Sequence, residues 1–237
     1  MKPVTIAESP MKTLLDTPIS YFVTPNISLR LKEGAKRLAS VEETVDFAFS
    51  FNCLGFSLNL HQVKEEILGF LNIVDNLNPE IVLEIGTFAG GTLFLLGRFS
   101  SPTATVFSID LPRLMTCWRS IVYKSFAKDH QRIHVIRSDS HDAKTLARIK
   151  KTLNGRNVDC LFIDGDHTYQ GVRKDFDMYA PLVRKGGIVS FHDIVPGPVT
   201  NVGGVPEFWS EIKSGYPSRE FVKDWSQQGY GIGMILV

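Results

Sequence analysis

The sequence predicts an α/β fold in which a doubly wound, mostly parallel sheet carries helices on both faces. Short apolar runs alternate along the chain with segments of helical periodicity, which is the pattern of repeated βα units. One such unit, residues 81–96, joins an apolar strand to an apolar helix through a glycine-rich turn. A strand, glycine turn and helix in this order are typical of the first unit of a nucleotide-binding sheet.

The glycine-rich turn organises the rest of the chain. Residues 81–85 form a continuous apolar run, which predicts a fully buried strand. Gly86 and Gly90 allow a sharp turn and the close approach of a ligand. The helix that starts near Thr92 directs its first N–H groups into this turn. Glu84 lies among the apolar strand residues and needs a partner there, because burying a carboxylate is costly.

A dinucleotide site is one interpretation of this turn. It would require G-x-G-x-x-G, in which the middle glycine makes room for a pyrophosphate. Phe88 occupies that middle position, so the pyrophosphate would be blocked. An NAD-type oxidoreductase is therefore an alternative that the turn disfavours.

The other elements follow from apolar patterning and from turn residues. Further strands are expected at residues 105–110, 133–136, 158–164, 188–191, 221–222 and 232–237. Helices are expected at residues 31–49, 60–77, 111–128, 143–153, 169–183 and 205–212, the fifth of them ended by Lys185-Gly-Gly187.

Polar side chains gather where the predicted strands end, and ligands of a parallel sheet bind at that edge. Asp110 ends the second strand, where a carboxylate can accept hydrogen bonds from ribose hydroxyls; a solvated turn aspartate is the alternative. Asp164 and Asp193 end two strands that should be close in space. Two converging carboxylates repel, and a hard divalent cation such as Mg²⁺ would relieve that repulsion.

Such a cation could hold a substrate hydroxyl and lower its pKa. Asp166 or His167, just beyond Asp164, could then act as the general base. Two simpler interpretations remain open at this point: Asp164 could cap the next helix, and His192 could be a partly buried structural histidine.

Several motifs in combination resemble one family of class I S-adenosyl-L-methionine (SAM) methyltransferases, the group of cephalosporin hydroxylase-like and macrolide or sugar O-methyltransferase-like proteins. The resemblance covers about residues 60 to 237. It rests on Glu84-x-Gly86-x-x-x-Gly90, Phe162-Ile-Asp-Gly-Asp-His-Thr-Tyr169, Lys185-Gly-Gly187, Phe191-His-Asp-Ile194 and Gly204-Val-Pro-Glu-Phe-Trp209.

The resemblance implies a Rossmann-like, seven-stranded sheet whose last strand is antiparallel, with SAM as the cofactor. Asp139 and Ser140 would lie near the adenine ring, although either could instead cap the helix at 143–153. The cofactor-binding residues that we expect are Glu84, Gly86, Thr87, Gly90, Asp110, Asp139, Ser140 and Asp164.

By the same resemblance, Asp164 and Asp193 would ligate Mg²⁺ with His192 at a third ligand position, and the base would be Asp166 or His167. The expected activity is SAM-dependent methylation of a hydroxyl on a small molecule. A SAM-binding protein without catalytic activity is the alternative from another class.

We divide the chain into an N-terminal helical extension, residues 1–58, and a methyltransferase domain, residues 59–237. The extension could serve as a cap, a lid or a contact in a homo-oligomer. It contains an aromatic-rich stretch, for which packing is favoured over a role in substrate binding: Phe47, Phe49, Phe51 and Phe56. Residues 197–204 form a loop beside the strand ends and are a candidate lid.

Composition excludes several classes of partner. The formal net charge is +1, so no global charge favours nucleic acid, and no apolar run approaches the roughly 18 residues of a membrane helix. The three cysteines lack metal-binding spacing, and the N-terminus lacks the apolar core of a signal peptide. We therefore expect a cytoplasmic protein that binds neither nucleic acid nor membrane.

Overall fold

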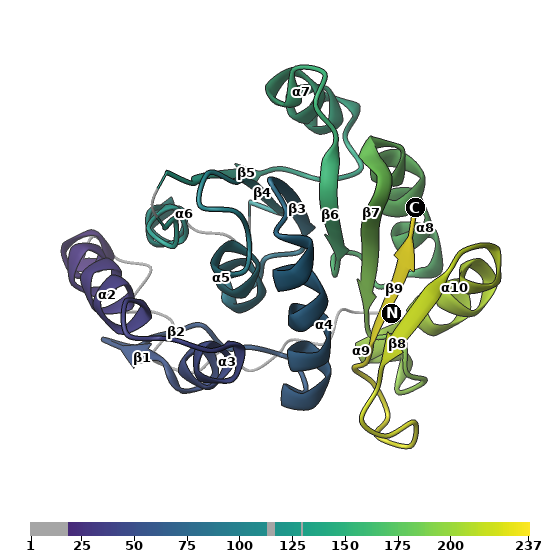
Figure 1. The fold of residues 1–237 in the computed structure, drawn as a ribbon, viewed down its shortest axis with the longest axis horizontal. Helices are drawn as coiled ribbons and strands as arrows, with labels where there is room; N and C mark the ends of the chain where they lie inside the picture. The colour runs from purple at the N-terminus through teal and green to yellow at the C-terminus, as the bar shows by residue number, and fades with distance from the viewer. Residues whose placement is uncertain (1–18, 113–116, 129) are drawn as a thin grey trace.

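A central sheet dominates the computed structural model, which describes residues 19–112, 117–128 and 130–237 (Figure 1). Within this part of the chain the sheet has seven strands in the order β5-β4-β3-β6-β7-β9-β8. The strands are β3 (Ile81–Ile85), β4 (Thr105–Asp110), β5 (Arg132–Arg137), β6 (Val158–Ile163), β7 (Val183–His192), β8 (Ser218–Phe221) and β9 (Ile232–Leu236).

The topology matches the predicted doubly wound sheet. The chain builds outward from β3 through β4 to β5, and then returns to place β6 and β7 on the other side of β3. These five strands are parallel, whereas β9 inserts antiparallel between β7 and β8, as predicted for the last strand. The strand order therefore reverses between β3 and β6, which is where such sheets bind ligands.

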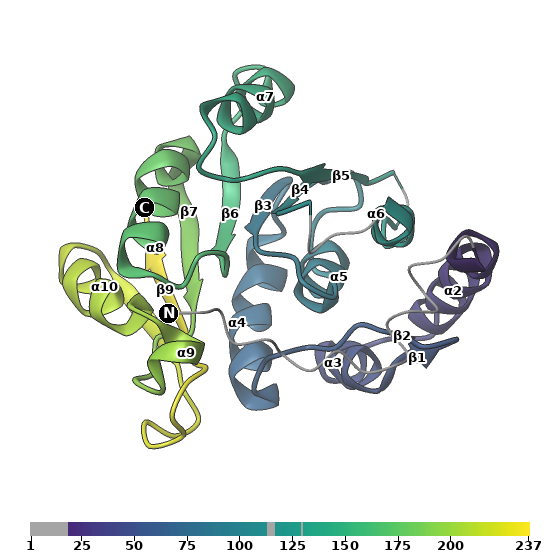
Figure 2. The ribbon, with the colours of Figure 1, turned by 180° about the vertical axis from the view of Figure 1, so that it is seen from behind.

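Helices cover both faces of the sheet, and each face has its own hydrophobic core (Figure 2). Successive residues of a strand point to opposite faces, so Val82 joins one core and Leu83 joins the other. The first core involves α2 (Ile19–Ala35), α3 (Val41–Ser50), α4 (Lys64–Leu77), α5 (Gly91–Arg98) and α6 (Cys117–Lys124). The second involves α7 (Ala143–Leu153), α8 (Tyr169–Tyr179) and α10 (Val205–Ile212).

The prediction of a single helix at residues 31–49 is wrong, because α2 ends at Ala35 and a second helix, α3, begins at Val41. The break results from a reciprocal cap at the start of α3. Ser40 Oγ accepts a hydrogen bond from the Glu43 N–H at 3.1 Å, and the Glu43 carboxylate accepts one from the Ala39 N–H at 2.8 Å. This S-x-x-E pattern begins a new helix. Helix α4 likewise starts at Lys64 rather than at residue 60.

The helix predicted for residues 169–183 is too long, and Lys185-Gly-Gly187 does not end it. Helix α8 stops at Tyr179, because Pro181 in the next 3₁₀ turn has no N–H to continue the ladder. Residues 185–187 belong to β7, opposite an irregular step in the pairing with β6. Gly186, at φ 75°, allows the extra residues to bulge there.

The N-terminal helices pack onto the main body. Ile27 and Leu31 of α2 and Val45 of α3 are buried in the same core as α5 and α6. The aromatic stretch is largely packed, because Phe47 contacts both Phe94 and Phe51, with 5.8 and 5.3 Å between ring centroids; Phe49 is the exposed member. The division of the chain after residue 58 remains a prediction. Among the described helices, none is long and apolar enough to cross a membrane.

Two short segments lie outside the main sheet and its long helices. A hairpin of β1 (Asn52–Cys53) and β2 (Phe56–Ser57) leads from α3 toward α4. The expected lid at residues 197–204 contains a helical turn, α9 (Val199–Val202), and its role as a lid stays a prediction.

The loop between β8 and β9 depends on one buried carboxylate, that of Glu66 in α4. Its Oε1 accepts hydrogen bonds from the Lys223 N–H at 2.9 Å and from the Gln227 amide at 2.7 Å, and its Oε2 accepts one from the Gly231 N–H at 2.9 Å. The neighbouring Glu65 is exposed, and its carboxylate pairs with the Lys223 ammonium at 2.6 Å. Glu66 therefore determines the conformation of residues 223–231.

We predict that Glu66→Gln lowers the free energy of unfolding by about 1–3 kcal/mol, because an amide nitrogen would replace a buried acceptor and leave backbone N–H groups unpaired. Chemical denaturation would measure the loss, and hydrogen exchange would locate it in residues 223–231. Glu65→Gln is the matched control and should leave stability unchanged. Equal losses of stability in the two variants would contradict this prediction, because they would show that the negative charge on α4, rather than the hydrogen bonds of Glu66, is what stabilises the protein.

Candidate functional site

A large cavity lies at the carboxyl ends of the strands, with a volume of about 830 Å³. Its walls come from the β3–α5 turn, the ends of β4 to β7 and the loop after β5. Residues 59–62 and 228–230 complete the opening. A volume in this range is typical of small-molecule sites. The cavity crosses the point where the strand order reverses, so the fold and the cavity indicate the same ligand position.

The Asp110 carboxylate holds the glycine-rich turn in place. Its Oδ2 accepts hydrogen bonds from the N–H groups of Thr87 at 3.0 Å and Phe88 at 2.8 Å, and its Oδ1 accepts one from the Leu111 N–H at 2.7 Å. Burial raises the pKa of Asp110, although these three bonds oppose the rise. Asp110 lines the cavity, and its oxygens retain acceptor capacity beyond the three backbone bonds.

The glycines of the turn are required by the protein's own packing. A Cβ on Gly86 would lie 1.8 Å from the Asp164 carbonyl oxygen, and the residue has φ 88°. A Cβ on Gly90, which has φ 89°, would lie 2.6 Å from the Tyr123 ring. Gly86 lines the cavity, but Gly90 does not. Close approach between protein segments therefore explains both glycines without a ligand.

Glu84 lies beneath the turn and is not among the residues that line the cavity. Burial raises its pKa well above the usual range, and the nearby hydroxyls of Thr87 and Ser108 only partly offset this effect. Those two hydroxyls also bond to each other. Burial therefore favours the protonated form of Glu84, which lies beneath the turn beside these two hydroxyls.

Asp139 and Ser140 line the cavity beyond the end of β5. Asp139 Oδ1 accepts a hydrogen bond from the His141 N–H at 2.8 Å. Neither residue caps α7, because Asp142 does so by accepting from the Lys144 N–H at 2.9 Å. The capping alternative for Asp139 and Ser140 is thus wrong, and both residues lie at the cavity wall, where the Ser140 side chain also bonds to Asp175.

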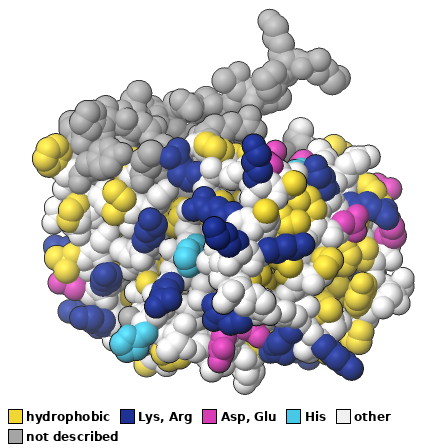
Figure 3. Space-filling model, turned by 90° about the horizontal axis from the view of Figure 1, so that it is seen from above, with side chains coloured by type: hydrophobic (Ala, Val, Ile, Leu, Met, Phe, Trp, Pro, Cys, Tyr) yellow, Lys and Arg dark blue, Asp and Glu magenta, His cyan; other side chains and the backbone are white. Residues whose placement is uncertain are grey.

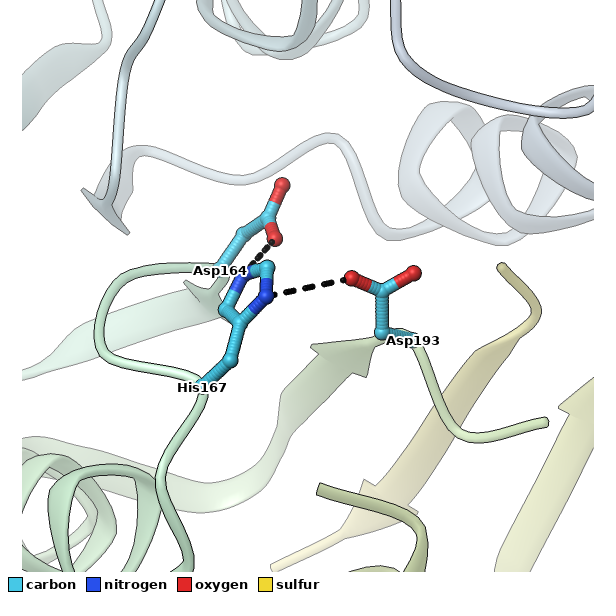
Figure 4. A group of neighbouring side chains, drawn as sticks. All are labelled: Asp164, His167 and Asp193. Carbon is cyan, nitrogen blue, oxygen red and sulfur yellow. Dashed lines mark hydrogen bonds and ion pairs between the residues drawn. The ribbon is translucent and has the colours of Figure 1, made fainter. Parts of the chain in front are cut away.

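Two aspartates and two histidines converge at the ends of β6 and β7. In Figure 4 the His167 ring lies between the carboxylates of Asp164 and Asp193. His167 Nε2 is 3.2 Å from Asp164 Oδ1, and His167 Nδ1 is 3.4 Å from Asp193 Oδ2. His192 approaches both carboxylates with its Nδ1, at 3.3 and 3.5 Å. We call these four residues the acidic–histidine cluster.

The cluster stabilises protonated imidazole. The hydrogen bond to Asp164 raises the pKa of His167 to about 9, although burial opposes the shift. Its other nitrogen lies 2.6 Å from the Asn201 carbonyl oxygen, so both ring nitrogens face acceptors and both carry protons. Desolvation alone would raise the pKa of Asp164, but His192 and His167 hold it below its usual range.

Burial and nearby charges also act in opposite directions on the pKa values of His192 and Asp193. Burial would lower the pKa of His192, but the carboxylates of Asp164 and Asp193 raise it. Burial raises the pKa of Asp193 despite the two nearby imidazoles.

The cluster has the donor set of a divalent-cation site. Asp164, His167 and Asp193 offer ligand atoms that all lie within 4.8 Å of one another. Carboxylate oxygens suit Mg²⁺ or Mn²⁺, and an imidazole nitrogen suits the second ion better than the first. In the arrangement described, the proton on His167 supplies the positive charge that a cation would otherwise bring. The donors therefore fit a divalent cation that displaces this proton.

The two candidate bases point in different directions. His167 faces the cluster, whereas Asp166 Oδ1 accepts a hydrogen bond from the Thr168 N–H at 2.9 Å, at the start of α8. Thr168 is the residue that caps α8, by accepting from the Gly171 N–H at 3.0 Å. Asp164 therefore does not cap this helix, so that simpler interpretation is wrong.

Most of the predicted site residues meet at this cavity. All of them line it except Glu84 and Gly90. Sequence reasoning missed two segments that line the cavity opening, residues 59–62 and 228–230. In the first, the His61 ring packs on Phe88 with 4.8 Å between centroids; in the second, the Tyr230 N–H donates to Asp193 Oδ1 at 3.0 Å. The run Gln228-Gly-Tyr-Gly231 is the one signal that could have indicated the second segment, because it predicts a tight turn.

Comparison with known proteins agrees with this geometry. Residues 83–194 match the family model of a methyltransferase domain. Protein R132 of Acanthamoeba polyphaga mimivirus is 34% identical over 145 residues, which are 60% of this chain. A Sinorhizobium fredii protein, y4gI, is 25% identical over 174 residues, which are 69% of this chain. The chain spans 62% and 18% of the lengths of these two relatives.

Solved structures share the fold. An O-methyltransferase of Bacillus cereus in complex with S-adenosylhomocysteine (SAH) has a TM-score of 0.58 at 18% identity, covering 90% of this chain and 100% of that one. TomG of Streptomyces achromogenes, an O-methyltransferase of tomaymycin synthesis in complex with SAM, has a TM-score of 0.56 at 18% identity, covering 85% and 91%. Residues 83–194 therefore resemble a methyltransferase domain, and the chain shares a Rossmann-like fold with these O-methyltransferases.

Proposed function

We propose that this protein is a SAM-dependent methyltransferase that methylates a hydroxyl group of a small molecule. The observation that carries the proposal is a single cavity that runs from the glycine-rich turn, past Asp110, to the acidic–histidine cluster. Residues suited to bind the cofactor and residues suited to acid–base chemistry would then share one space. The methyltransferase domain and the O-methyltransferases of the same fold support this choice.

The lining chemistry fits SAM. When bound, SAM supplies an activated methyl group on a cationic sulfur. Asp110 could accept from ribose hydroxyls, and Asp139 and Ser140 could contact the adenine ring. Among the described residues that line the cavity there is no lysine or arginine. The absence of cationic side chains from this lining disfavours the pyrophosphate of NAD, and the Phe88 side chain in the turn disfavours it further.

Methyl transfer to oxygen requires alignment and removal of a proton. The acceptor oxygen forms its bond to the methyl group as the sulfur–methyl bond breaks, and the hydroxyl proton passes to a base. We favour His167 over Asp166 as this base, acting once a bound cation has displaced the extra proton that its ring carries in the cluster, because His167 lies between the cluster carboxylates whereas Asp166 is engaged at α8. This assignment also favours an enzyme over a SAM-binding protein without activity.

Asp164 and Asp193 would hold a divalent cation, with an imidazole of His167 or His192 as a further ligand. A bound cation would supply Lewis acidity toward the acceptor hydroxyl. Tyr230 fixes Asp193 through its N–H, and Glu66 fixes the loop that carries Tyr230. These hydrogen bonds would fix the position of the Asp193 carboxylate before any cation binds.

We predict that SAH stabilises the protein against heat, whereas NAD does not. A ligand at 100 times its Kd adds about 2.7 kcal/mol of stability, and differential scanning fluorimetry would detect the shift. Asp110→Ala should abolish the shift, because it removes the ribose acceptor and releases the turn. Asp142→Ala, in the next loop but outside the cavity lining, is the control that should retain it. Stabilisation by NAD alone would contradict the proposed function.

We also predict that Asp164→Asn and Asp193→Asn each weaken Mn²⁺ binding at least tenfold, or by about 1.4 kcal/mol. Each change removes one anionic ligand. Isothermal titration with Mn²⁺ and with Mg²⁺ would measure the affinities. Asp166→Asn is the matched control, since its carboxylate faces α8 rather than the cluster. Unchanged binding in both cluster variants would remove the metal from the proposal.

A further inference from the structure

The charge on the cavity lining is strongly one-sided. Five aspartates and four histidines line it, and among its described residues there is no lysine, arginine or glutamate. The chain as a whole is nearly neutral, with 26 basic and 25 acidic residues. The basic residues lie elsewhere: Figure 3, which views the molecule from the α7 side, shows many Lys and Arg side chains on the face away from the strand ends. The two ends of the sheet therefore differ in charge.

We propose that the acceptor carries no anionic group: it is a ring-bearing hydroxyl compound that is neutral or bears an amine, and carboxylates, phosphates and coenzyme A esters are rejected. This inference rests on the proposed function, because it concerns the second substrate of the same cavity. Two independent features of the cavity support it, namely its charge and its aromatic opening.

The charge argument holds even with both cofactors bound. A divalent cation and the sulfonium of SAM would neutralise three of the five carboxylates, which leaves a formal charge of −2 with neutral histidines. An anionic acceptor would enter this net negative field, and no lysine or arginine among the described lining residues would pair with it. Like charges a few ångströms apart repel each other strongly in a partly enclosed site. An amine would be attracted by the same field.

The helix N-terminus beside the cluster does not replace a basic side chain there. Helix N-termini bind anions through free N–H groups. At the start of α8 the Thr168 N–H donates to Asp166 and the Gly171 N–H donates to Thr168, whereas the uncapped start of α5 lies at the glycine-rich turn, where the cofactor is proposed to bind. The two N–H groups of α8 are already bonded within the protein, so a phosphate would have to displace a carboxylate to reach them.

The opening of the cavity is aromatic. Phe88 is 52% exposed and Tyr230 is 42% exposed, although large aromatic side chains are usually buried. Both have left-handed backbones, at φ 46° and 62°, which is unusual for bulky residues and is typical of functional sites. His61 packs on Phe88, and the Tyr230 ring lies near the His192 ring. Exposed aromatic faces bind flat rings and attract cations, which matches a ring-bearing or amine-bearing acceptor.

Three diols that share one ring test the proposal: dopamine, 4-ethylcatechol and 3,4-dihydroxyphenylacetate. Their side chains are cationic, neutral and anionic, while the hydroxyls are identical. Binding would be measured calorimetrically on protein loaded with SAH and Mg²⁺, and methyl transfer would be measured with SAM and Mg²⁺. We expect the anionic diol to bind at least tenfold more weakly than the neutral one, and the cationic diol to bind at least as tightly.

Two variants of Gln228, an exposed residue at the opening, test whether charge causes the discrimination against the anionic diol. Gln228→Lys adds one positive charge there and should reduce the discrimination against the anionic diol about threefold. Gln228→Met has a similar length without the charge and should leave the order of the three diols unchanged. A reduction of equal size in both variants would show that shape, not charge, sets the order.

The outcomes separate the two proposals. SAH binding with equal or tighter binding of the anionic diol would overturn the inference and leave the proposed function intact. SAH binding without binding of any diol would overturn the ring-bearing acceptor. Failure of SAH to bind would overturn the proposed function itself, before any acceptor is considered.

Discussion

The site depends on how closely β3 and β6 approach each other at their carboxyl ends. The Asp164 N–H donates to the Ile85 carbonyl at 2.8 Å, and Gly86 then turns away so near to β6 that a side chain would overlap the Asp164 carbonyl. This contact fixes the position of the glycine-rich turn and also that of Asp164, the cluster residue at the end of β6. It also explains why the turn begins with glycine: the constraint comes from the neighbouring strand, and the cavity is its consequence.

The second constraint is electrostatic. Asp164 and Asp193 come together because parallel strands end at the same edge, and two carboxylates at this distance are unstable unless positive charge is placed between them. His167 and His192 supply it in the structure, which is why the pKa of His167 rises while that of Asp164 falls. The same physics would suit the cluster to a cation, since a divalent ion can replace a proton that two carboxylates already attract.

The fold was predictable from the sequence wherever the determinant is local. The apolar runs of β3 and β6 and the glycine turn are contiguous, and Asp110, Asp164 and Asp193 follow strands directly, so topology brings them together. Prediction failed where one pattern has two uses: Lys185-Gly-Gly187 resembles a helix stop but forms a bulge in β7. It also failed at Glu66, whose partners lie more than 150 residues along the chain and leave no mark on local periodicity.

Glu66 shows how distant parts of the chain combine into one wall of the cavity. Its three hydrogen bonds hold residues 223–231, and that loop carries Tyr230, whose N–H holds Asp193. Helix α4 therefore influences a cluster residue that it never touches. On the other side of the opening, residues 59–62 lead into the same helix and place His61 against Phe88. One helix thus connects the aromatic opening, where an acceptor would enter, to the charged cluster, where it would react.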